Sequence, residues 1–361
     1  MIHQYNYYKI ENNYEILKGK KVIIWCRSIT ALQIYKVLRN CGIEVIGFTD
    51  SFANRPNEMF AGIPVYTFEE IANMGNTAIY IATNVYQYQQ EILEQTSRLK
   101  NADVYTTGDV YGAGLFDIAH MKQAIKKADN KIRYIRENLA DERSREVFDR
   151  LIEYRVTNDR KRIPEIYERE HAQYFPTEDW IRLKDEEVFV DVGAHDGATS
   201  LDFCNWTKGR YSKIYMMEPD PLMFEIMKEY AALNKMDHVV PIQSGAYSFT
   251  GELRFEEDSA TGSSRITEAG ETVIRVVSID DMLKGEKATF IKMDIEGAEM
   301  EALLGDKKTI EKYKPRLAVS VYHKADDLWE IPYYVLSHYP TYKIYLRHYA
   351  LTTNETVMYA V

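Results

Sequence analysis

The stretch Val188-Phe-Val-Asp-Val-Gly-Ala-His-Asp-Gly-Ala-Thr-Ser200 decides the fold class of this 361-residue chain. Val188 to Val192 is predicted to be a short buried strand, Gly193 and Gly197 break its pattern, and Ala198 to Trp206 can form a helix. A buried strand that passes through a glycine turn into a helix is typical of the ligand-binding corner of an open α/β sheet. The first glycine lets a ligand approach the backbone, because no Cβ stands in the way.

The spacing of the two glycines indicates which ligand the turn accepts. They form GxxxG behind Asp191, whereas dinucleotide-binding folds use GxGxxG. A dinucleotide loop places backbone amides and a helix N-terminus on a pyrophosphate, and Asp191 would repel that anion. A carboxylate at this position suits a cationic or neutral nucleoside. S-adenosylmethionine is such a ligand, with a sulfonium and an amino group.

Length and composition favour two domains of a globular protein. The chain exceeds one typical domain, and its 28 % charged and 45 % hydrophobic residues are ordinary values. A net charge of -10 without a basic block argues against nucleic acid as a partner. The 28 tyrosines suit sugar binding, although core and strand positions account for them better.

Cysteine usage and the N-terminus indicate the compartment. Cys26, Cys41 and Cys204 lack CxxC spacing, so we predict neither a disulfide framework nor a zinc site. The N-terminal residues MIHQYNYYKIENN contain no signal-peptide apolar run, and no run of about 18 apolar residues occurs. We therefore expect a soluble cytoplasmic protein without an integral membrane segment. The sequence leaves oligomeric assembly open.

Residues 1–112 are predicted to form a small Rossmann-like α/β domain. Strands are expected at Lys20–Trp25, Ile43–Phe48 and Ala78–Ala82, with helices at Thr30–Asn40 and Tyr86–Leu99. The segment GFTDSFANRPNEMFAGIPVYTFEEI resembles the N-terminal domain of bacterial sugar-modifying acyltransferases, which binds a nucleotide-sugar.

The first turn of this domain departs from the acyltransferase pattern. Those proteins have a glycine-rich turn after their first strand, and this chain has Cys26-Arg27-Ser28-Ile29. Asp50, at the end of the second strand, can hold a ribose. A structural or substrate-docking role is nevertheless favoured over nucleotide binding.

Residues 113–184 are predicted to be a helical connector. Apolar residues recur there at helical spacing among mixed charges, which indicates a solvated surface and not a binding site: Ile132, Ile135, Leu139, Val147 and Leu151. The connector closes with the aromatic stretch Tyr174-Phe175-Pro176.

Residues 185–361 are predicted to form a second, larger α/β domain. After Val188–Val192, further strands are expected at Lys213–Met217, Val239–Ile242, Thr289–Met293, Arg316–Val321, Tyr342–His348 and Glu355–Val361. The last two are expected to pair antiparallel. A hairpin is also expected around Phe249–Glu252, with Gly251 at its turn.

Polar groups follow four of these predicted strands, where the ligands of open α/β sheets bind. They are Asp191 with its glycines, Glu218-Pro219-Asp220, Ser244-Gly245-Ala246, and the run from Asp294 to Glu299. Glu218 ends the second strand, and a carboxylate there can accept hydrogen bonds from both ribose hydroxyls. A solvated strand-end acid is the alternative.

Several stretches in order resemble the FkbM family of S-adenosylmethionine-dependent methyltransferases: VFVDVGAHDGATS, MEPDP, QSGAYS, GSS at 262–264, VVSIDDML and FIKMDIEGAEMEAL. The resemblance covers about half of the chain, from Glu187 onward, and LADERSREVFDRLIEYR resembles what precedes the domain in longer members. It implies a class I methyltransferase fold, a seven-stranded sheet with helices on both faces and the last strand antiparallel. It also implies O-methylation, often of a sugar or polyketide hydroxyl.

The resemblance also assigns roles to residues. It implies that Asp191, Gly193, Ala194 and Gly197 surround the methionine part of the cofactor and that Glu218 binds its ribose. The two sides of the adenine are assigned to Pro219 with Asp220 and to Ser244, Gly245 and Ala246. Asp294 and Glu296 would lie next to the departing methyl group. His195 replaces the asparagine expected there, and it either caps the helix or faces the sulfonium pocket.

A methyl acceptor hydroxyl has to lose its proton, so a general base is expected. The candidates are Asp294, Glu296, His195 and His323, which follows the fifth predicted strand and belongs to a residue type that titrates near neutral pH. A hydrogen-bonded loop histidine is the alternative for His323. Asp294 and Glu296 could bind Mg²⁺, but without a recognisable third ligand we predict no metal site.

The sequence therefore predicts an S-adenosylmethionine-dependent O-methyltransferase whose substrate is a carbohydrate, with nucleotide-linked and lipid-linked sugars both left open. The N-terminal domain would bind substrate or organise assembly. Two alternatives are kept: a nicotinamide-dependent sugar oxidoreductase, which would need a GxGxxG turn, and a non-catalytic binding protein with a relic methyltransferase fold.

Overall fold

The computed structural model describes residues 17–361 except 56, 84, 100–101, 107–109, 112–113, 116–117, 158–160, 170–171, 185, 259–262 and 267–271. Its internal contacts divide the chain into two units. Unit 1 comprises Met1–Ala124, Leu151–Glu165 and Leu351–Thr353, and unit 2 comprises Ile125–Arg150, Ile166–Ala350 and Asn354–Val361. The predicted boundaries at 112 and 184 remain predictions.

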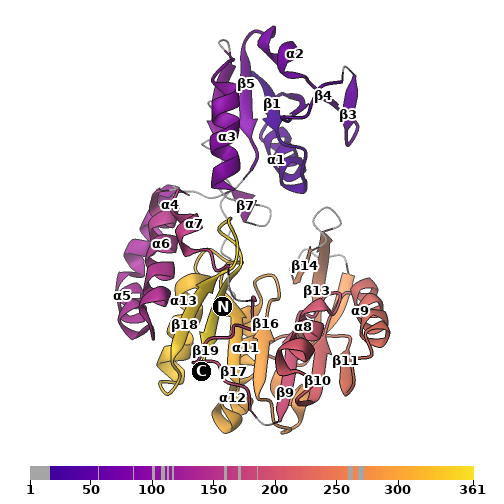
Figure 1. Ribbon diagram of the computed structural model, residues 1–361, viewed down its shortest axis with the longest axis vertical. Coiled ribbons are helices and arrows are strands. Elements are labelled where there is room, and N and C mark those ends of the chain that lie inside the picture. Colours follow the sequence, from indigo (N-terminus) through magenta and orange to yellow (C-terminus); the bar gives the residue numbers. More distant parts are fainter. Residues whose placement is uncertain are drawn as a thin grey trace. The chain divides into compact units, whose positions relative to one another are not determined.

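Unit 1 is built on a six-stranded sheet with the order β3-β4-β2-β1-β5-β6 (Figure 1). Its strands are β1 (Lys21–Trp25), β2 (Val45–Thr49), β3 (Glu58–Phe60), β4 (Ile63–Val65), β5 (Thr77–Ile81) and β6 (Ala102–Thr106). All neighbouring pairs are parallel except β3 with β4. The predicted small parallel sheet is confirmed, and the short strands β3, β4 and β6 were not predicted.

Three helices accompany this sheet: α1 (Ile29–Asn40), α2 (Phe68–Ala72) and α3 (Tyr86–Thr96). Helix α2 begins in a capping box, in which the Thr67 hydroxyl accepts from Glu70 N and the Glu70 carboxylate accepts from Thr67 N. Buried apolar residues of β1 and β5 form the core, because a parallel strand between two neighbours buries both faces. The short strands β7 (Val110–Tyr111) and β8 (Gly114–Leu115) form a separate antiparallel pair.

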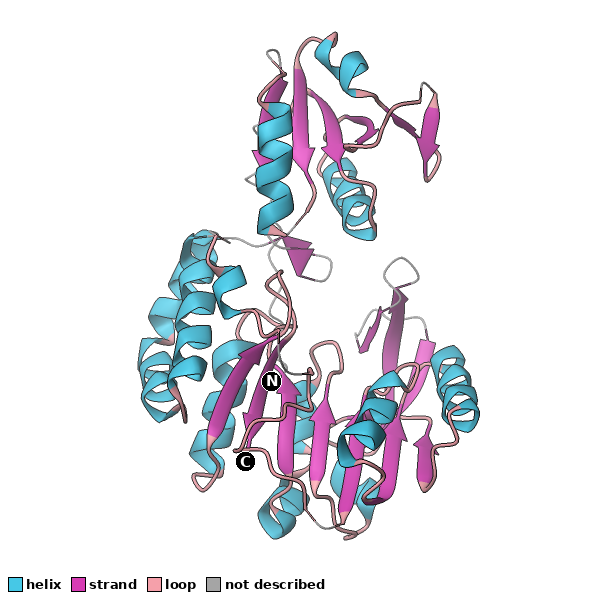
Figure 2. Cartoon of the chain, in the orientation of Figure 1, coloured by secondary structure: helices cyan, strands magenta, loops and turns pink. Residues whose placement is uncertain are grey.

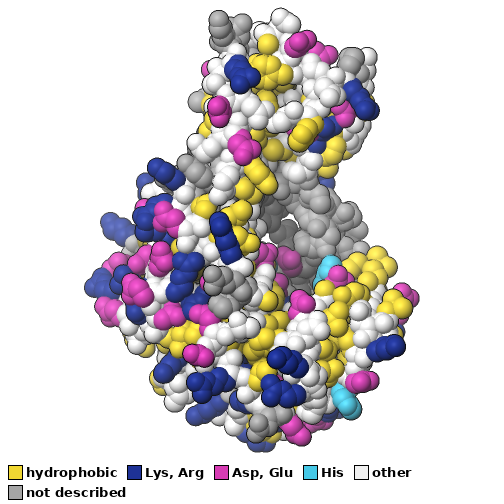
Figure 3. Space-filling view, viewed as in Figure 1, with side chains coloured by type: hydrophobic (Ala, Val, Ile, Leu, Met, Phe, Trp, Pro, Cys, Tyr) yellow, Lys and Arg dark blue, Asp and Glu magenta, His cyan; other side chains and the backbone are white. Residues whose placement is uncertain are grey.

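Helices α4 (Ile118–Lys127), α5 (Asp129–Asn138), α6 (Glu142–Thr157) and α7 (Ile163–Ile166) follow. The apolar positions Ile135, Leu139, Val147 and Leu151 are buried, as their spacing predicts. Basic and acidic side chains intermingle on the surface of α5 and α6 in Figure 3, and Arg136 forms an ion pair with Asp149 at 2.8 Å. The charges of α5 thus belong to a solvated surface, whereas Arg155 of α6 is buried.

Unit 2 contains a seven-stranded sheet with the order β11-β10-β9-β16-β17-β19-β18. Its strands are β9 (Glu187–Val192), β10 (Tyr211–Met217), β11 (Val239–Ile242), β16 (Phe290–Met293), β17 (Arg316–Ser320), β18 (Ile344–His348) and β19 (Thr356–Ala360). Strand β19 is antiparallel to β17 and β18, and the other neighbours are parallel. This is the predicted class I methyltransferase sheet.

Helices pack along both faces of this sheet (Figure 2). They are α8 (Ala198–Thr207), α9 (Pro221–Leu233), α10 (Ile279–Leu283), α11 (Glu299–Leu304), α12 (Lys307–Tyr313) and α13 (Asp327–His338). One part of the core is aromatic, and the ring of Phe175 contacts those of Phe189, Phe203 and Phe290. Large buried rings contribute strongly to stability, so the ring contacts of Phe175 anchor the segment that leads into β9.

Unit 2 also contains a separate four-stranded sheet with the order β12-β15-β13-β14. It consists of β12 (Gly245–Ala246), β13 (Gly251–Asp258), β14 (Ser263–Ile266) and β15 (Thr272–Val277). The predicted hairpin turn at Gly251 is wrong, because Gly251 begins β13 and pairs with Val276 of β15. Gly262 of the GSS motif lies outside the described residues.

None of the helices in the described part of the chain has the length and apolar character needed to cross a bilayer.

Candidate active site

The turn between β9 and α8 is shaped by two glycines with positive φ. Gly193 has φ +78°, and a Cβ there would lie 2.0 Å from the carbonyl oxygen of Asp294. Gly197, the N-cap of α8, has φ +89°. The amides of Gly193 and Ala194 donate to Met217 O at 3.1 and 2.9 Å. The glycines therefore let the turn pass between the ends of β10 and β16.

Glu218, which follows β10, joins this turn to the next one. Its Oε2 accepts from His195 N and its Oε1 accepts from Asp220 N, both at 2.9 Å. Burial raises the pKa of the Glu218 carboxyl, although the two backbone hydrogen bonds oppose that rise. Each carboxylate oxygen has about two lone-pair sites, so both oxygens keep one for a ligand. This donor set fits the two hydroxyls of a ribose.

Asp191 is fully buried and paired within the protein. Its Oδ1 lies 3.1 Å from Lys292 Nζ, and its Oδ2 accepts from the Ser200 hydroxyl at 2.7 Å. Lys292 Nζ also donates to Gly193 O at 2.6 Å and lies 5.4 Å from the centre of the Tyr174 ring. Lys292 thus offsets the charge of Asp191, which the sequence interpretation had left free to attract a cationic ligand. The assignment of Asp191 to the cofactor stays a prediction.

The residues predicted to flank the adenine gather around the end of β10. Asp220 is the N-cap of α9, and its Oδ1 accepts from Met223 N at 2.8 Å. Ser244 Oγ donates to Arg275 O at 3.1 Å, and Gly245 with Ala246 forms β12. A Cβ at Gly245 would lie 3.8 Å from Pro219 Cβ. The structure brings these residues together, and their contact with adenine stays a prediction.

His195 is the most exposed of the predicted site residues. Its side chain is 59 % exposed, and Nδ1 lies 3.9 Å from Asp196 Oδ1. Asp196 Oδ1, in turn, accepts from Ala198 N at 3.0 Å. The imidazole of His195 therefore does not cap α8, and only its backbone amide contacts Glu218.

Asp294 follows β16 and is held by two tyrosines. Its Oδ2 accepts from the Tyr174 hydroxyl at 2.7 Å, and its Oδ1 accepts from the Tyr322 hydroxyl at 3.3 Å. Burial alone would raise the pKa of Asp294. The positive charges of His323 and Lys292, with the hydrogen bond from Tyr174, outweigh that effect and lower the pKa.

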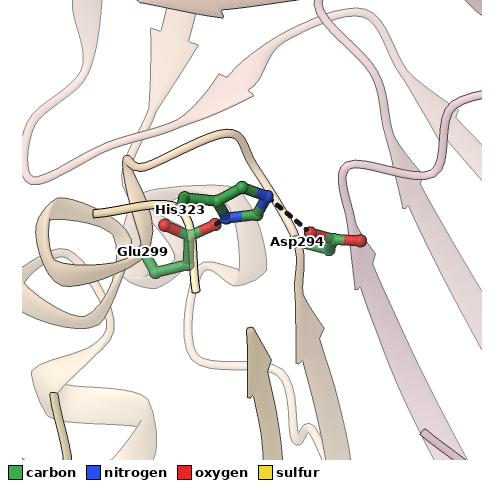
Figure 4. Close-up of side chains that lie close together, drawn as sticks. All are labelled: Asp294, Glu299 and His323. Atoms are coloured by element: carbon green, nitrogen blue, oxygen red, sulfur yellow. Dashed lines mark ion pairs between the residues drawn. The ribbon is translucent and has the colours of Figure 1, made fainter. Parts of the chain in front are cut away.

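His323 lies between carboxylates from two directions (Figure 4). Its Nδ1 is 2.8 Å from Glu299 Oε1, and its Nε2 is 3.3 Å from Asp294 Oδ1 and 3.7 Å from Glu296 Oε2. Burial lowers the pKa of His323, but Glu299, Asp294 and Glu296 together raise it to about 10. The expectation that His323 titrates near neutral pH is therefore wrong. Its assignment to catalysis stays a prediction.

Two further acids complete this group. Glu296 is 44 % exposed and has φ +54°, a conformation uncommon for a residue other than glycine. Glu355 precedes the antiparallel strand β19, and its carboxylate accepts from Gln173 at 2.6 Å and from Tyr322 at 3.3 Å. Because β19 runs opposite to β17, its beginning lies at the same sheet edge as Asp294.

The predicted residues thus form two neighbouring groups at one edge of the sheet. The first surrounds the turns after β9, β10 and β11, and the second follows β16 and β17. Chain order reverses between β9 and β16, and such a switch point is where open α/β sheets bind ligands. Sequence reasoning missed the roles of Lys292, Tyr174, Tyr322, Glu299 and Glu355. Glu299 was visible in the DIEGAE motif, and Tyr174 in the aromatic stretch before β9.

In unit 1, the position equivalent to Glu218 has a different environment. Asp50, after β2, accepts from the side chain of Arg27, which also pairs with Glu58. A cavity of about 180 Å³ lies beside Asp50 and is lined by Trp25, Phe68 and Arg98 among others. Nucleotide binding by unit 1 remains a prediction.

Comparisons with known proteins agree with this geometry. Residues 191–343 match the family model described as the methyltransferase FkbM domain. A crystal structure of methyltransferase FkbM from Methylobacillus flagellatus KT is similar over 98 % of this chain and 93 % of its own, with 22 % identity and a TM-score of 0.79. This likeness shows a shared fold. None of the curated proteins matches this sequence.

Two weaker similarities carry no further argument. An rRNA methylase from Streptococcus thermophilus shares 13 % identity over 49 % of this chain and 87 % of its own, with a TM-score of 0.31. A Streptococcus mutans protein in complex with SAH shares 13 % identity over 49 % of this chain and 90 % of its own, with a TM-score of 0.32.

Proposed function

We propose that this chain, whose residues 191–343 form an FkbM methyltransferase domain, uses S-adenosylmethionine to methylate a hydroxyl oxygen of a carbohydrate or nucleotide-sugar. The observation that carries the proposal is Glu218, whose two oxygens join the turns after β9 and β10 at the switch point of the sheet. The acceptor class comes from the family resemblance of the sequence.

The residues around Glu218 fit the nucleoside of this cofactor. Glu218 would hold the ribose, and the backbone of Gly193 to His195 would lie along the methionine part. Pro219 and Ser244 to Ala246 would enclose the adenine. When bound, the cofactor supplies a methyl group activated by a positively charged sulfur. No basic side chain would be needed to hold it, since it carries no phosphate.

The protein's own contribution to methyl transfer would be alignment and removal of a proton. Holding two reactants in line can supply about 7–11 kcal/mol of the barrier. A positioned base adds roughly 10²–10⁴-fold when the acceptor is a hydroxyl. Asp294, Glu296 and His323 lie next to the turns that would hold the cofactor, and Glu296 is the most exposed of the three. These side chains would bind and orient the acceptor hydroxyl.

Calorimetry with S-adenosylhomocysteine tests the cofactor assignment. The wild type should bind one molecule per chain, and Glu218→Ala should lower the affinity by at least about 100-fold, because a buried acceptor of two hydrogen bonds is lost. Glu225→Ala, which removes an exposed acid of α9, serves as the matched control. Tight binding by a folded Glu218→Ala protein would refute the assigned pocket.

Two further measurements address the alternatives and the acceptor. A thermal shift with S-adenosylhomocysteine and none with NAD would separate a methyltransferase from a nicotinamide-dependent oxidoreductase. Mass spectrometry of glycans and nucleotide-sugars, incubated with enzyme and cofactor, should reveal a product heavier by about 14 daltons, the mass of one added CH₂. Cofactor binding without any methylated glycan would instead support a non-catalytic binding protein.

A further inference from the structure

The second group of site residues contains a histidine whose surroundings resemble those of a metal ligand. His323 is only 9 % exposed, and its Nε2 faces Asp294 Oδ1 at 3.3 Å and Glu296 Oε2 at 3.7 Å. Neighbouring ligand atoms around a metal ion are separated by similar distances, since metal–ligand bonds measure about 2.0–2.2 Å. We propose that His323 Nε2, Asp294 and Glu296 bind a first-row divalent metal ion such as Mn²⁺ or Zn²⁺.

Glu299 occupies the position of a supporting carboxylate. Its side chain is fully buried, and Oε1 lies 2.8 Å from His323 Nδ1, on the opposite side of the ring from Asp294 (Figure 4). The same oxygen accepts from Ile295 N at 2.8 Å, which fixes the carboxylate in place. Metal-binding histidines commonly direct their second ring nitrogen to a carboxylate in this way. Asp294, Glu299 and His323 thus lie close together, with one side-chain oxygen or nitrogen of each within 4.8 Å of the others.

An independent observation is that the buried polar atoms here are not all satisfied. Among the described residues, Glu299 Oε2 is buried without a hydrogen-bond partner, whereas His323 Nδ1 faces Glu299 Oε1 at 2.8 Å. Buried polar groups in folded proteins are normally hydrogen-bonded, and exceptions mark unfilled ligand positions or missing ions. The carboxylate of Glu299 is therefore not fully engaged by protein groups.

The charge of the group also favours a cation. Four carboxyl groups converge here, from Asp294, Glu296, Glu299 and Glu355, around the single imidazole of His323. The nearby Lys292 is already paired with Asp191. Partly buried carboxylates are costly without compensation, and a divalent ion would replace the one proton that His323 can carry with two positive charges.

The donor set selects among metals. One imidazole nitrogen with carboxylate oxygens suits Mn²⁺, Fe²⁺ or Zn²⁺, whereas Mg²⁺ and Ca²⁺ favour oxygen ligands alone. An ion at this edge of the sheet would lie beside the position assigned to the acceptor and could lower the pKa of a bound hydroxyl. That consequence rests on the proposed function, but metal binding itself does not. The inference replaces the sequence-based expectation of no metal site.

Metal titration of the full chain tests this inference without relying on activity. Metal-free protein is titrated with Mn²⁺, and free Mn²⁺ is followed by electron paramagnetic resonance, with Zn²⁺ competition and parallel Mg²⁺ titrations. The wild type should bind one Mn²⁺ per chain, displaced by Zn²⁺. Glu299→Gln should bind about 10–100-fold more weakly, and His323→Gln at least as weakly as that. His338→Gln, altered at an exposed histidine of α13, should bind like the wild type.

Each outcome decides the matter. No saturable binding of Mn²⁺ or Zn²⁺ by the wild type, or equal binding by His323→Gln, would overturn the metal site. If His323→Gln does not fold, Glu296→Gln at the exposed end of the group gives the same comparison. Binding of S-adenosylhomocysteine is measured on the same samples. A protein that binds this ligand but no metal refutes the metal site alone, and the reverse result refutes the cofactor pocket alone.

Discussion

The two units contain equivalent positions that are used differently. In each, a central parallel strand is followed by a turn, and the neighbouring strand ends in an acid: Glu218 after β10 and Asp50 after β2. Within the described residues, Glu218 accepts hydrogen bonds only from backbone amides, those of His195 and Asp220, which leaves lone pairs for a ligand. Asp50 is bound by the guanidinium of Arg27, a residue that stands where unit 2 has a glycine turn. A similar sheet therefore has an acid with free lone pairs in one unit, the proposed nucleoside site, and an ion pair in the other.

The largest expected effect comes from the buried pair beneath the turn in unit 2. Lys292→Met should destabilise the protein by about 3–5 kcal/mol, because Asp191 would be left charged and buried without its partner. Chemical denaturation followed by tryptophan fluorescence measures the loss. Lys228→Met, which breaks an exposed pair on α9, should cost less than about 1 kcal/mol. Similar losses for both variants would mean that the buried pair has no special role.

Adding a side chain at the glycine turn after β9 should have the next largest effect. Gly193→Ala places a Cβ 2.0 Å from Asp294 O at φ +78°, so we expect a loss of about 3 kcal/mol together with loss of S-adenosylhomocysteine binding. Gly209→Ala is the control, because Gly209 has φ +74° and open space around it. It should cost only the backbone strain, about 1 kcal/mol. Unimpaired ligand binding by Gly193→Ala would contradict the assigned turn.

A smaller effect is expected at the turn after β10. Asp220→Ala removes the N-cap of α9 and should destabilise the protein by about 1 kcal/mol. Asp220→Asn keeps a capping oxygen and should recover most of that stability, as measured by denaturation. If Asp220→Asn instead weakens S-adenosylhomocysteine binding strongly at full stability, the carboxylate contacts the ligand directly.

The smallest effect is expected in unit 1. Asp50→Ala should leave the affinity for S-adenosylhomocysteine unchanged in calorimetry, because the nucleoside site lies in unit 2. Its effect on stability should be about 1 kcal/mol, because Arg27 keeps its pair with Glu58. A large loss of affinity would place the ligand in unit 1 and reverse the comparison between the units.

The sequence predicted much of the fold because its signals are local. Apolar runs mark all seven strands of the large sheet, and glycines and acids mark the ends of β9, β10 and β16. The partners across the sheet were not predicted. The sequence places Lys292 within a strand but does not reveal its partner. Its pairing with Asp191 depends on the register of β16 beside β9. This register can be known only once the order of the strands in the sheet is known.

The rest of the second group depends on contacts between distant segments. Tyr174 reaches Asp294 from 120 residues away, and Glu355 arrives because β19 runs antiparallel to β17. The acids beside His323 all lie between Asp294 and Glu299, whereas His323 follows β17, so its charge depends on the packing of two separate segments and could not be inferred from its residue type alone. Spacing along the chain gives the positions of strand-end residues, but packing decides what surrounds them.

The most direct test of the central claim is a crystal structure of the full chain with S-adenosylhomocysteine. The account predicts the ligand at the turns after β9 and β10, with its two ribose hydroxyls hydrogen-bonded to the carboxylate of Glu218. An empty position at Glu218, or a ligand bound at Asp50 instead, would contradict it.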